Sequence, residues 1–104
     1  MVGPNMQNRQ RPKVGYGELL ATIADHEKYR QRLPGGRRAI FQFRDLSHLT
    51  MAGVDLSGAD FTGCNLQSVN FSDTNLSNAV LYGADLRGAI LQGARLDRPD
   101  LRGA

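Results

Sequence analysis

The sequence predicts an all-β solenoid over residues 37–104, preceded by one capping helix with its turn in residues 15–36 and by a basic arm in residues 1–14. Two observations lead to this prediction. A large apolar residue recurs at every fifth position through the C-terminal part of the chain, with small and polar residues at fixed offsets from it. Before that repeat, a stretch with the apolar spacing of a helix ends at a Pro-Gly-Gly sequence.

One column of the repeat has no exception. Read in groups of five from Arg44, the chain is RDLSH, LTMAG, VDLSG, ADFTG, CNLQS, VNFSD, TNLSN, AVLYG, ADLRG, AILQG, ARLDR and PDLRG. The third residues are all large and apolar: Leu46, Met51, Leu56, Phe61, Leu66, Phe71, Leu76, Leu81, Leu86, Leu91, Leu96 and Leu101. The first residue of a group is mostly small or apolar, the second is mostly Asp or Asn, and the fifth is often Gly.

A period of five fits neither of the common secondary structures. A helix repeats its faces about every 3.6 residues and a strand about every 2. Apolar residues five apart would therefore spiral around a helix and alternate between the faces of a strand. The pattern fits a chain in which each group forms one short extended side followed by a corner. The third and first residues then point inward, and Gly, Asn, Asp and Ser accept the tight turns.

These groups resemble the pentapeptide-repeat family, whose motif A(D/N)LxG is present as ADFTG, ADLRG and PDLRG. The resemblance covers residues 44–103, with AIFQF at residues 39–43 as a candidate thirteenth group. It implies a right-handed quadrilateral β-helix with four groups per coil and about three coils. Departures from the expected first column include Arg44, Leu49 and Pro99, and departures from the second include Val80, Ile90 and Arg95.

Four groups per coil predict four stacks of core side chains. The expected stacks are Leu46, Leu66 and Leu86; Met51, Phe71 and Leu91; Leu56, Leu76 and Leu96; and Phe61, Leu81 and Leu101. Successive coils would lie about one strand spacing, ~4.8 Å, apart. Each coil contacts only its neighbours, so we expect stability to come from the interfaces between coils.

The N-terminal segment predicts a cover for the first coil. A helical apolar stripe over roughly residues 16–32 would be laid on that coil, and Pro34-Gly35-Gly36 would end the helix. The stripe consists of Tyr16, Leu19, Leu20, Ile23 and Leu33. Residues 1–14 are polar and basic, and we expect them to be disordered. Residues 1–43 carry eight basic and three acidic residues, whereas residues 44–104 carry five and seven.

No cover is visible in the sequence after the last group, which makes the last coil the candidate interaction end. Its residues are Leu86, Leu91, Leu96, Leu101, Arg98 and Arg102. One interpretation is a homodimer in which the last coils of two protomers stack end to end. The other is a fragment whose repeats continue in a longer protein. Arg87, Arg95, Arg98 and Arg102 point to different faces, which favours a solubilising surface over a site for an acidic partner.

The sequence contains no recognisable catalytic, cofactor or metal motif, so we predict none of these sites and no enzyme. His26 and His48 are the only histidines, and with the lone Cys64 they make a poor zinc ligand set. We interpret both histidines as solvated or locally hydrogen-bonded, and Cys64 as a buried structural thiol. We interpret the Asp and Asn column as side chains bonded to nearby backbone. Gly35-Gly36 before Arg37-Arg38 could cradle a phosphate, although a helix-ending turn explains it more simply.

The predicted function is a non-catalytic protein–protein interaction or scaffold module with an unidentified protein partner. The family resemblance raises an alternative, a DNA mimic that binds DNA gyrase or topoisomerase, but the repeat has a net charge of only −2. Direct nucleic-acid binding by the basic arm is disfavoured because aromatic residues are sparse there. The absence of a long apolar run, a secretory signal and a cysteine pair predicts no membrane association and a cytoplasmic location.

Overall fold

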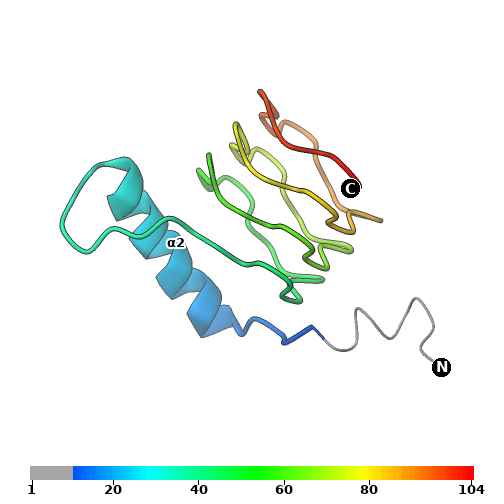
Figure 1. Ribbon diagram of the computed structural model, residues 1–104, viewed down its shortest axis with the longest axis horizontal. Coiled ribbons are helices and arrows are strands. Elements are labelled where there is room, and N and C mark those ends of the chain that lie inside the picture. The colour runs from blue at the N-terminus through cyan, green and yellow to red at the C-terminus, as the bar shows by residue number, and fades with distance from the viewer. Residues whose placement is uncertain (1–10) are drawn as a thin grey trace.

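The structure, a computed structural model, describes residues 11–104, which form one helix followed by a coiled solenoid (Figure 1). The helix α2 spans Tyr16–Arg30 and lies across the N-terminal end of the solenoid. It ends two residues before the expected residue 32, since Arg32 has a positive φ of 57°. The expected arm falls mainly on residues 1–10, outside the described residues.

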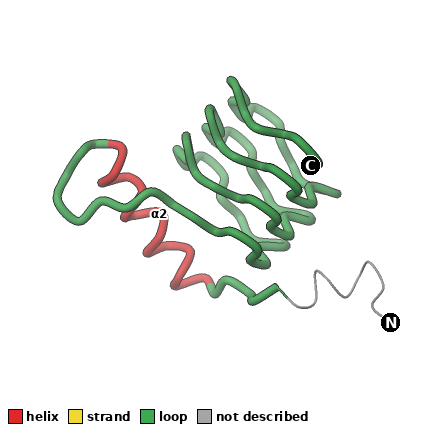
Figure 2. The backbone as a smooth tube through the Cα atoms, viewed as in Figure 1, coloured by secondary structure: helices red, strands yellow, loops and turns green. Residues whose placement is uncertain are grey.

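The solenoid is held together by parallel bridges between residues 20 positions apart, which corresponds to four groups of five per coil. Each bridge involves a single residue pair, so the tube in Figure 2 shows loops and no strand over the described part of the chain. The bridges form four columns: Asp45–Asn65–Asp85, Thr50–Asn70–Ile90, Asp55–Asn75–Arg95 and Ile40–Asp60–Val80–Asp100. Each column is one side of the coil.

Each side of the middle coil donates three backbone hydrogen bonds to the neighbouring coils. In the group CNLQS, the amide of Asn65 donates to the carbonyl of Arg44 at 3.0 Å, one coil earlier. The amides of Leu66 and Ser68 donate in the other direction, to Asp85 and Arg87 at 2.8 and 3.0 Å. This pairing satisfies the backbone of a short extended segment without long strands.

A left-handed residue forms every corner from residue 43 to residue 103. All thirteen fifth residues have φ between 54° and 76°. Seven are Gly, and the other six are Phe43, His48, Ser68, Asp73, Asn78 and Arg98. The glycines adopt this conformation without the steric cost that a Cβ adds. The six other residues adopt it because the coil must turn at the same place on every side.

The core is a set of stacked side chains inside the coils. Phe41 and Phe61 stack with ring centroids 5.5 Å apart, and Phe61 meets Phe71 edge-on at 5.8 Å. The large third residues from Phe41 to Leu81 are at most 1% exposed. Burial decreases in the last coil, where Leu86 and Leu91 are only partly buried.

Helix α2 turns a different face to the solenoid than the sequence indicated. Leu19 and His26 are buried and Ile23 is partly buried, whereas Tyr16 and Leu20 are about half exposed. Leu33, beyond the helix, is also exposed. The prediction of one stripe from all five apolar residues was therefore wrong. The covering face is centred on Leu19 and His26, because the His26 ring bonds to the first coil.

The end of the expected arm also differs from the prediction. Asp45 donates its amide to the carbonyl of Pro12 and accepts from the amide of Val14, both at 2.9 Å. Lys13 forms the bridge with Asp45, and Val14 is only 1% exposed. Residues 12–14 therefore add one paired segment to the first coil. The physical reason is that the unpaired backbone edge of a first coil needs hydrogen-bond partners.

Candidate interaction site

The C-terminal end of the solenoid has an apolar floor. It forms a depression of about 300 Å³ lined by Leu81, Leu86, Leu91, Leu96, Leu101 and Ala104. These leucines are the innermost residues of their groups, and in earlier coils the same position is fully buried by the next coil. Here Leu96 and Leu101 are 37% and 47% exposed. The four predicted leucines of the interaction end thus lie together.

The same end presents unpaired backbone donors. Leu66 and Leu76 donate their amides to Asp85 and Arg95 at 2.8 Å, one coil later. Within residues 11–104, no acceptor faces the equivalent amides of Leu86, Leu91, Leu96 and Leu101, or those of Gly88, Gly93, Arg98 and Gly103. This end therefore combines an apolar floor with a rim of free N–H groups.

Unpaired backbone acceptors alternate with these donors. In the middle coil, the carbonyl of Cys64 accepts from Asp85 at 2.9 Å, as the carbonyl of Val69 does from Ile90. The equivalent carbonyls of the last coil, on Ala84, Ala89, Ala94 and Pro99, accept no backbone bond from any described residue. Such an edge is a template for another extended segment.

The two predicted arginines lie outside this depression. Arg102 forms an ion pair with Asp100 at 2.7 Å, and its guanidinium lies 5.3 Å from the centre of the Tyr82 ring. This contact lowers the pKa of Asp100, chiefly through the side-chain hydrogen bond. Arg98 instead lines a polar hollow of about 560 Å³ on the side of the solenoid, next to Arg95 and Asp97. The arginines therefore do not form one charged patch with the apolar floor.

The other arginines of the last coil are largely neutralised by their own coil. Arg87 pairs with Asp85 at 2.7 Å and Arg95 pairs with Asp97 at 3.0 Å. In each pair the partners are two residues apart and the arginine is highly exposed. These short-range pairs leave the sides of the last coil mixed in charge.

The Asp and Asn column of the repeat has the structural role expected for it. Their Oδ1 atoms accept hydrogen bonds from the amide two residues later, which closes a small side-chain turn. The pairs are Asp45–Ser47, Asp55–Ser57, Asp60–Thr62, Asn65–Gln67, Asn70–Ser72, Asn75–Ser77, Asp85–Arg87 and Asp100–Arg102. Among the residues that the structure describes, no group of three His, Cys, Asp or Glu could hold a metal ion.

Cys64 and His48 offer no reactive group at this site. The thiol of Cys64 is buried and donates to the carbonyl of Phe41 at 2.6 Å. Burial raises the pKa of the Cys64 thiol to about 11, so it is protonated at neutral pH. His48 occupies an exposed corner with φ of 66°.

Gly35 and Gly36 serve the turn after the helix. Gly35 has a φ of 80°, and a Cβ on Gly36 would overlap the backbone of Tyr29. The backbone amide of the next residue, Arg37, donates to the carbonyl of Asp25 at 3.0 Å, and Arg38 Nε donates to the carbonyl of Gly58 in the first coil at 2.6 Å. The two glycines therefore have the turn-forming role expected for them.

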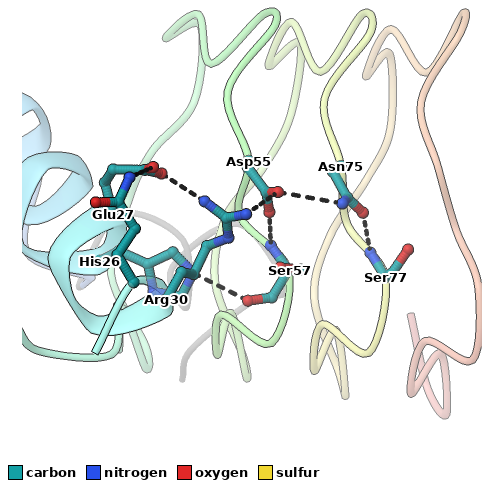
Figure 3. A network of polar contacts seen from close by, with 8 residues as sticks. His26, Glu27, Arg30, Asp55, Ser57, Asn75 and Ser77 are labelled. Atoms are coloured by element: carbon teal, nitrogen blue, oxygen red, sulfur yellow. Dashed lines mark hydrogen bonds and ion pairs between the residues drawn. The ribbon is translucent and has the colours of Figure 1, made fainter. Parts of the chain in front are cut away.

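Sequence reasoning missed the polar contacts that join the helix to the first coil. Arg44 forms two hydrogen bonds with the carboxylate of Glu18, at 2.8 and 2.9 Å, and two more with the carbonyls of Pro12 and Lys13. Arg30 pairs with Asp55 at 2.8 Å (Figure 3). The presence of Arg44 in a column of small residues was the sequence feature that could have indicated these contacts. Its side chain turns outward to the helix instead of into the core.

A family model described as pentapeptide repeats matches eight copies over residues 39–78 and 64–103, which is more than half of the chain. No curated protein matches. A crystal structure of a pentapeptide repeat protein from the cyanobacterium Cyanothece 51142 is 34% identical with a TM-score of 0.59, and covers 62% of this chain and 44% of that one. The matched repeats imply a right-handed β-helix solenoid.

Two further solved structures are similar over a comparable share of the chain. One is a pentapeptide repeat protein of the Arabidopsis thaliana thylakoid lumen, 31% identical with a TM-score of 0.41, covering 61% of this chain and 47% of that one. The other is HetL from Nostoc sp. strain PCC 7120, 28% identical with a TM-score of 0.39, covering 62% of this chain and 35% of that one. The chain spans less than half the length of each of these three proteins.

Proposed function

Because this chain belongs to the pentapeptide-repeat family, we propose that it is a non-catalytic interaction module that self-associates through the end of its last coil. The observation that carries the proposal is the combination of an apolar floor with a rim of unpaired N–H and C=O groups. A partner must cover the exposed leucines and also supply extended backbone that can bond to the unpaired N–H and C=O groups. Another coil of the same repeat provides both apolar side chains and extended backbone.

A second copy of the chain is the occupant that fits this end. Each last coil carries donors on its third and fifth residues and acceptors on its first residues. A two-fold axis would bring the donors and acceptors of one copy against those of the other, since an isologous interface uses the same surface on both copies. The facing sides would then run antiparallel, a geometry in which inter-strand hydrogen bonds form well.

The cover at the other end limits the size of the assembly. We propose that α2 and residues 12–14 act as the N-terminal cap of about three coils. Arg44, Glu18 and the Asp45 backbone bonds hold this cover in place. A solenoid with two open ends would add copies head to tail into filaments, whereas one open end closes as a dimer.

The DNA-mimic alternative has no observation in its favour. A mimic of duplex DNA needs dense negative charge along its sides, because the phosphate field dominates such binding. Here Arg87, Arg95 and Arg102 each neutralise an aspartate of the last coil. Association through the end of the rod depends instead on its leucines and backbone.

Light scattering coupled to size-exclusion chromatography tests the proposal. The 104-residue chain should elute as a dimer at tens of micromolar. Leu101→Lys should be a monomer, since it places an unpaired charge in the interface. Ile90→Lys is the matched control, because Ile90 is about as exposed as Leu101, at 48% against 47%, but lies on a side of the coil. A monomeric parent chain, or equal effects of the two substitutions, would refute self-association through this end.

A further inference from the structure

His26 is buried between α2 and the first coil, with both ring nitrogens hydrogen-bonded. Its side chain is 0% exposed. Nδ1 accepts the amide N–H of Ala39 at 2.9 Å. Nε2 lies 2.9 Å from the carbonyl of Ser57 (Figure 3). A backbone amide can only donate and a carbonyl can only accept. The two partners therefore require a neutral ring with its proton on Nε2.

These two bonds join three parts of the chain. His26 belongs to α2, Ala39 begins the first group that joins the solenoid, and Ser57 lies on one side of the first coil. One turn further along the helix, Arg30 pairs with Asp55 of that same side at 2.8 Å. The His26 ring is thus the buried member of the contact that holds the C-terminal half of α2 on the solenoid.

The surroundings of His26 oppose a positive charge. Arg30 on the same helix and Arg38 from the following turn both disfavour the charged ring, while Asp55 from the first coil favours it. Tyr29 stacks on the His26 ring with centroids 5.7 Å apart. Burial is the largest influence and lowers the pKa of His26, and it outweighs the hydrogen bond to the carbonyl of Ser57, which raises that pKa.

Asp55 is poorly placed to compensate a protonated ring. Its carboxylate already binds Arg30, accepts from the amide of Ser57 at 3.0 Å and accepts from the side-chain amide of Asn75 at 3.3 Å. Protonation of His26 would also turn Nδ1 into a donor that faces the donating amide of Ala39. The hydrogen bond between Nδ1 and the Ala39 amide is then lost, and the two donors can separate only if the helix or residue 39 moves.

We propose that His26 is a pH-sensitive latch that holds α2 on the first coil near neutral pH and releases it in mild acid. The released helix uncovers the first coil, including Leu46 and Leu56, which are fully buried in the closed state. The N-terminal end of the solenoid is then open to partners. The latch is independent of self-association through the last coil, since it lies at the opposite end.

The direction of the pH dependence follows from linkage. The open state binds the proton with the ordinary histidine pKa of about 6.5, and the closed state binds it more weakly. The contribution of His26 to holding α2 on the first coil is therefore complete above the ordinary histidine pKa, and it weakens as the pH falls below that pKa. The population of the open state rises by up to about tenfold per pH unit until the lower pKa of the closed state is reached.

Hydrogen exchange measured residue by residue between pH 7.5 and 5.0 tests the latch. After correction for intrinsic exchange rates, protection of the Ala39 amide and of α2 should fall toward pH 5. Protection of Leu66 and Phe71 in the middle coil should stay constant, because the opening is local. His26→Gln should abolish the pH dependence, since a glutamine can accept and donate at the same places without titrating. His48→Gln is the matched control at an exposed corner and should behave as the parent chain.

Three results would overturn the latch. One is helix protection that does not change with pH, and another is equal pH dependence in the parent chain and His26→Gln. The third is a loss of protection in the helix and the middle coil together, which means global unfolding. If His26→Gln does not fold, the parent chain still decides the matter by NMR. Titration of the His26 ring must then coincide with the loss of Ala39 protection, with the His48 ring as the internal comparison.

Discussion

The ring of Phe43 lies against Gly63, the residue twenty positions later at the same corner of the next coil. Both residues have a positive φ, of 58° and 65°. A Cβ on Gly63 would overlap the Phe43 ring, whereas a Cβ on Gly53 would meet nothing within 4 Å. The two glycines have similar backbone conformations. A comparison of alanine substitutions at these positions therefore separates the energetic cost of the left-handed backbone from the cost of overlap with the Phe43 ring.

We therefore expect Gly63→Ala to lower the free energy of unfolding more than Gly53→Ala does. The left-handed conformation alone costs about 1 kcal/mol for alanine. Overpacking against Phe43 adds about 1–3 kcal/mol at Gly63. Urea unfolding followed by circular dichroism measures both. Phe43→Ala should reduce the excess cost in the double variant, and a strictly additive double variant would contradict the contact.

The stack of Leu46, Leu66 and Leu86 predicts a gradient of stability along the rod. Leu66 is 0% exposed between its two neighbours, whereas Leu86 is only partly buried. Leu66→Ala should cost about 3–5 kcal/mol, and Leu86→Ala clearly less. Urea unfolding at low protein concentration, where the last coil is uncovered, gives the comparison. Equal costs would mean that the last coil is packed as completely as the middle one.

The pair of Glu18 and Arg44 predicts an acid-dependent contribution to stability. The hydrogen bond from Arg44 lowers the pKa of Glu18. The contribution is therefore present above the ordinary glutamate pKa and is lost as the pH falls through the lowered value. Glu18→Gln should cost about 0.5–1 kcal/mol at pH 7, since the Glu18 side chain is 47% exposed, and clearly less at pH 3, where the carboxyl is increasingly protonated. Unfolding free energies at the two pH values test this, and a difference that does not change with pH contradicts it.

Cys64 should be unreactive in the folded chain. Its pKa of about 11 and its burial leave little accessible thiolate, so a thiol-reactive dye should label it only when urea opens the fold. Cys64→Ser should be tolerated to within about 1 kcal/mol if the hydroxyl keeps the bond to Phe41. Thr74 shows this arrangement, since its hydroxyl donates to Met51 at 2.7 Å. Rapid labelling without urea would disprove the buried position.

Much of the solenoid could be predicted because its side chains repeat with its backbone. The column of large residues indicates which side chains face inward, and the glycines indicate corners. Phe43, His48 and Arg98 could not be recognised as left-handed corners from their residue types. Closure of the coil imposes that conformation, and the preference of a single residue is too weak to resist it.

The contacts at the N-terminal end were harder to predict for a different reason. The pairing of residues 12–14 depends on an unpaired backbone edge, which has no signature in side-chain types. The covering face of α2 is centred on a polar residue, His26, whose two partners lie 13 and 31 positions away. Apolar periodicity cannot identify such a residue. The apolar end of the last coil was predictable because its leucines belong to the repeat itself.

Amide exchange in the last coil tests the central claim most directly. The amides of Ala89 and Ala94 donate to Leu86 and Leu91 at 3.0 Å within the described chain. They should therefore be protected at every protein concentration. The amides of Leu86, Leu91, Leu96 and Leu101 should exchange freely when dilute and become protected as the concentration rises through tens of micromolar. Fast exchange of these four amides at all concentrations, while Ala89 and Ala94 stay protected, would contradict self-association through the last coil.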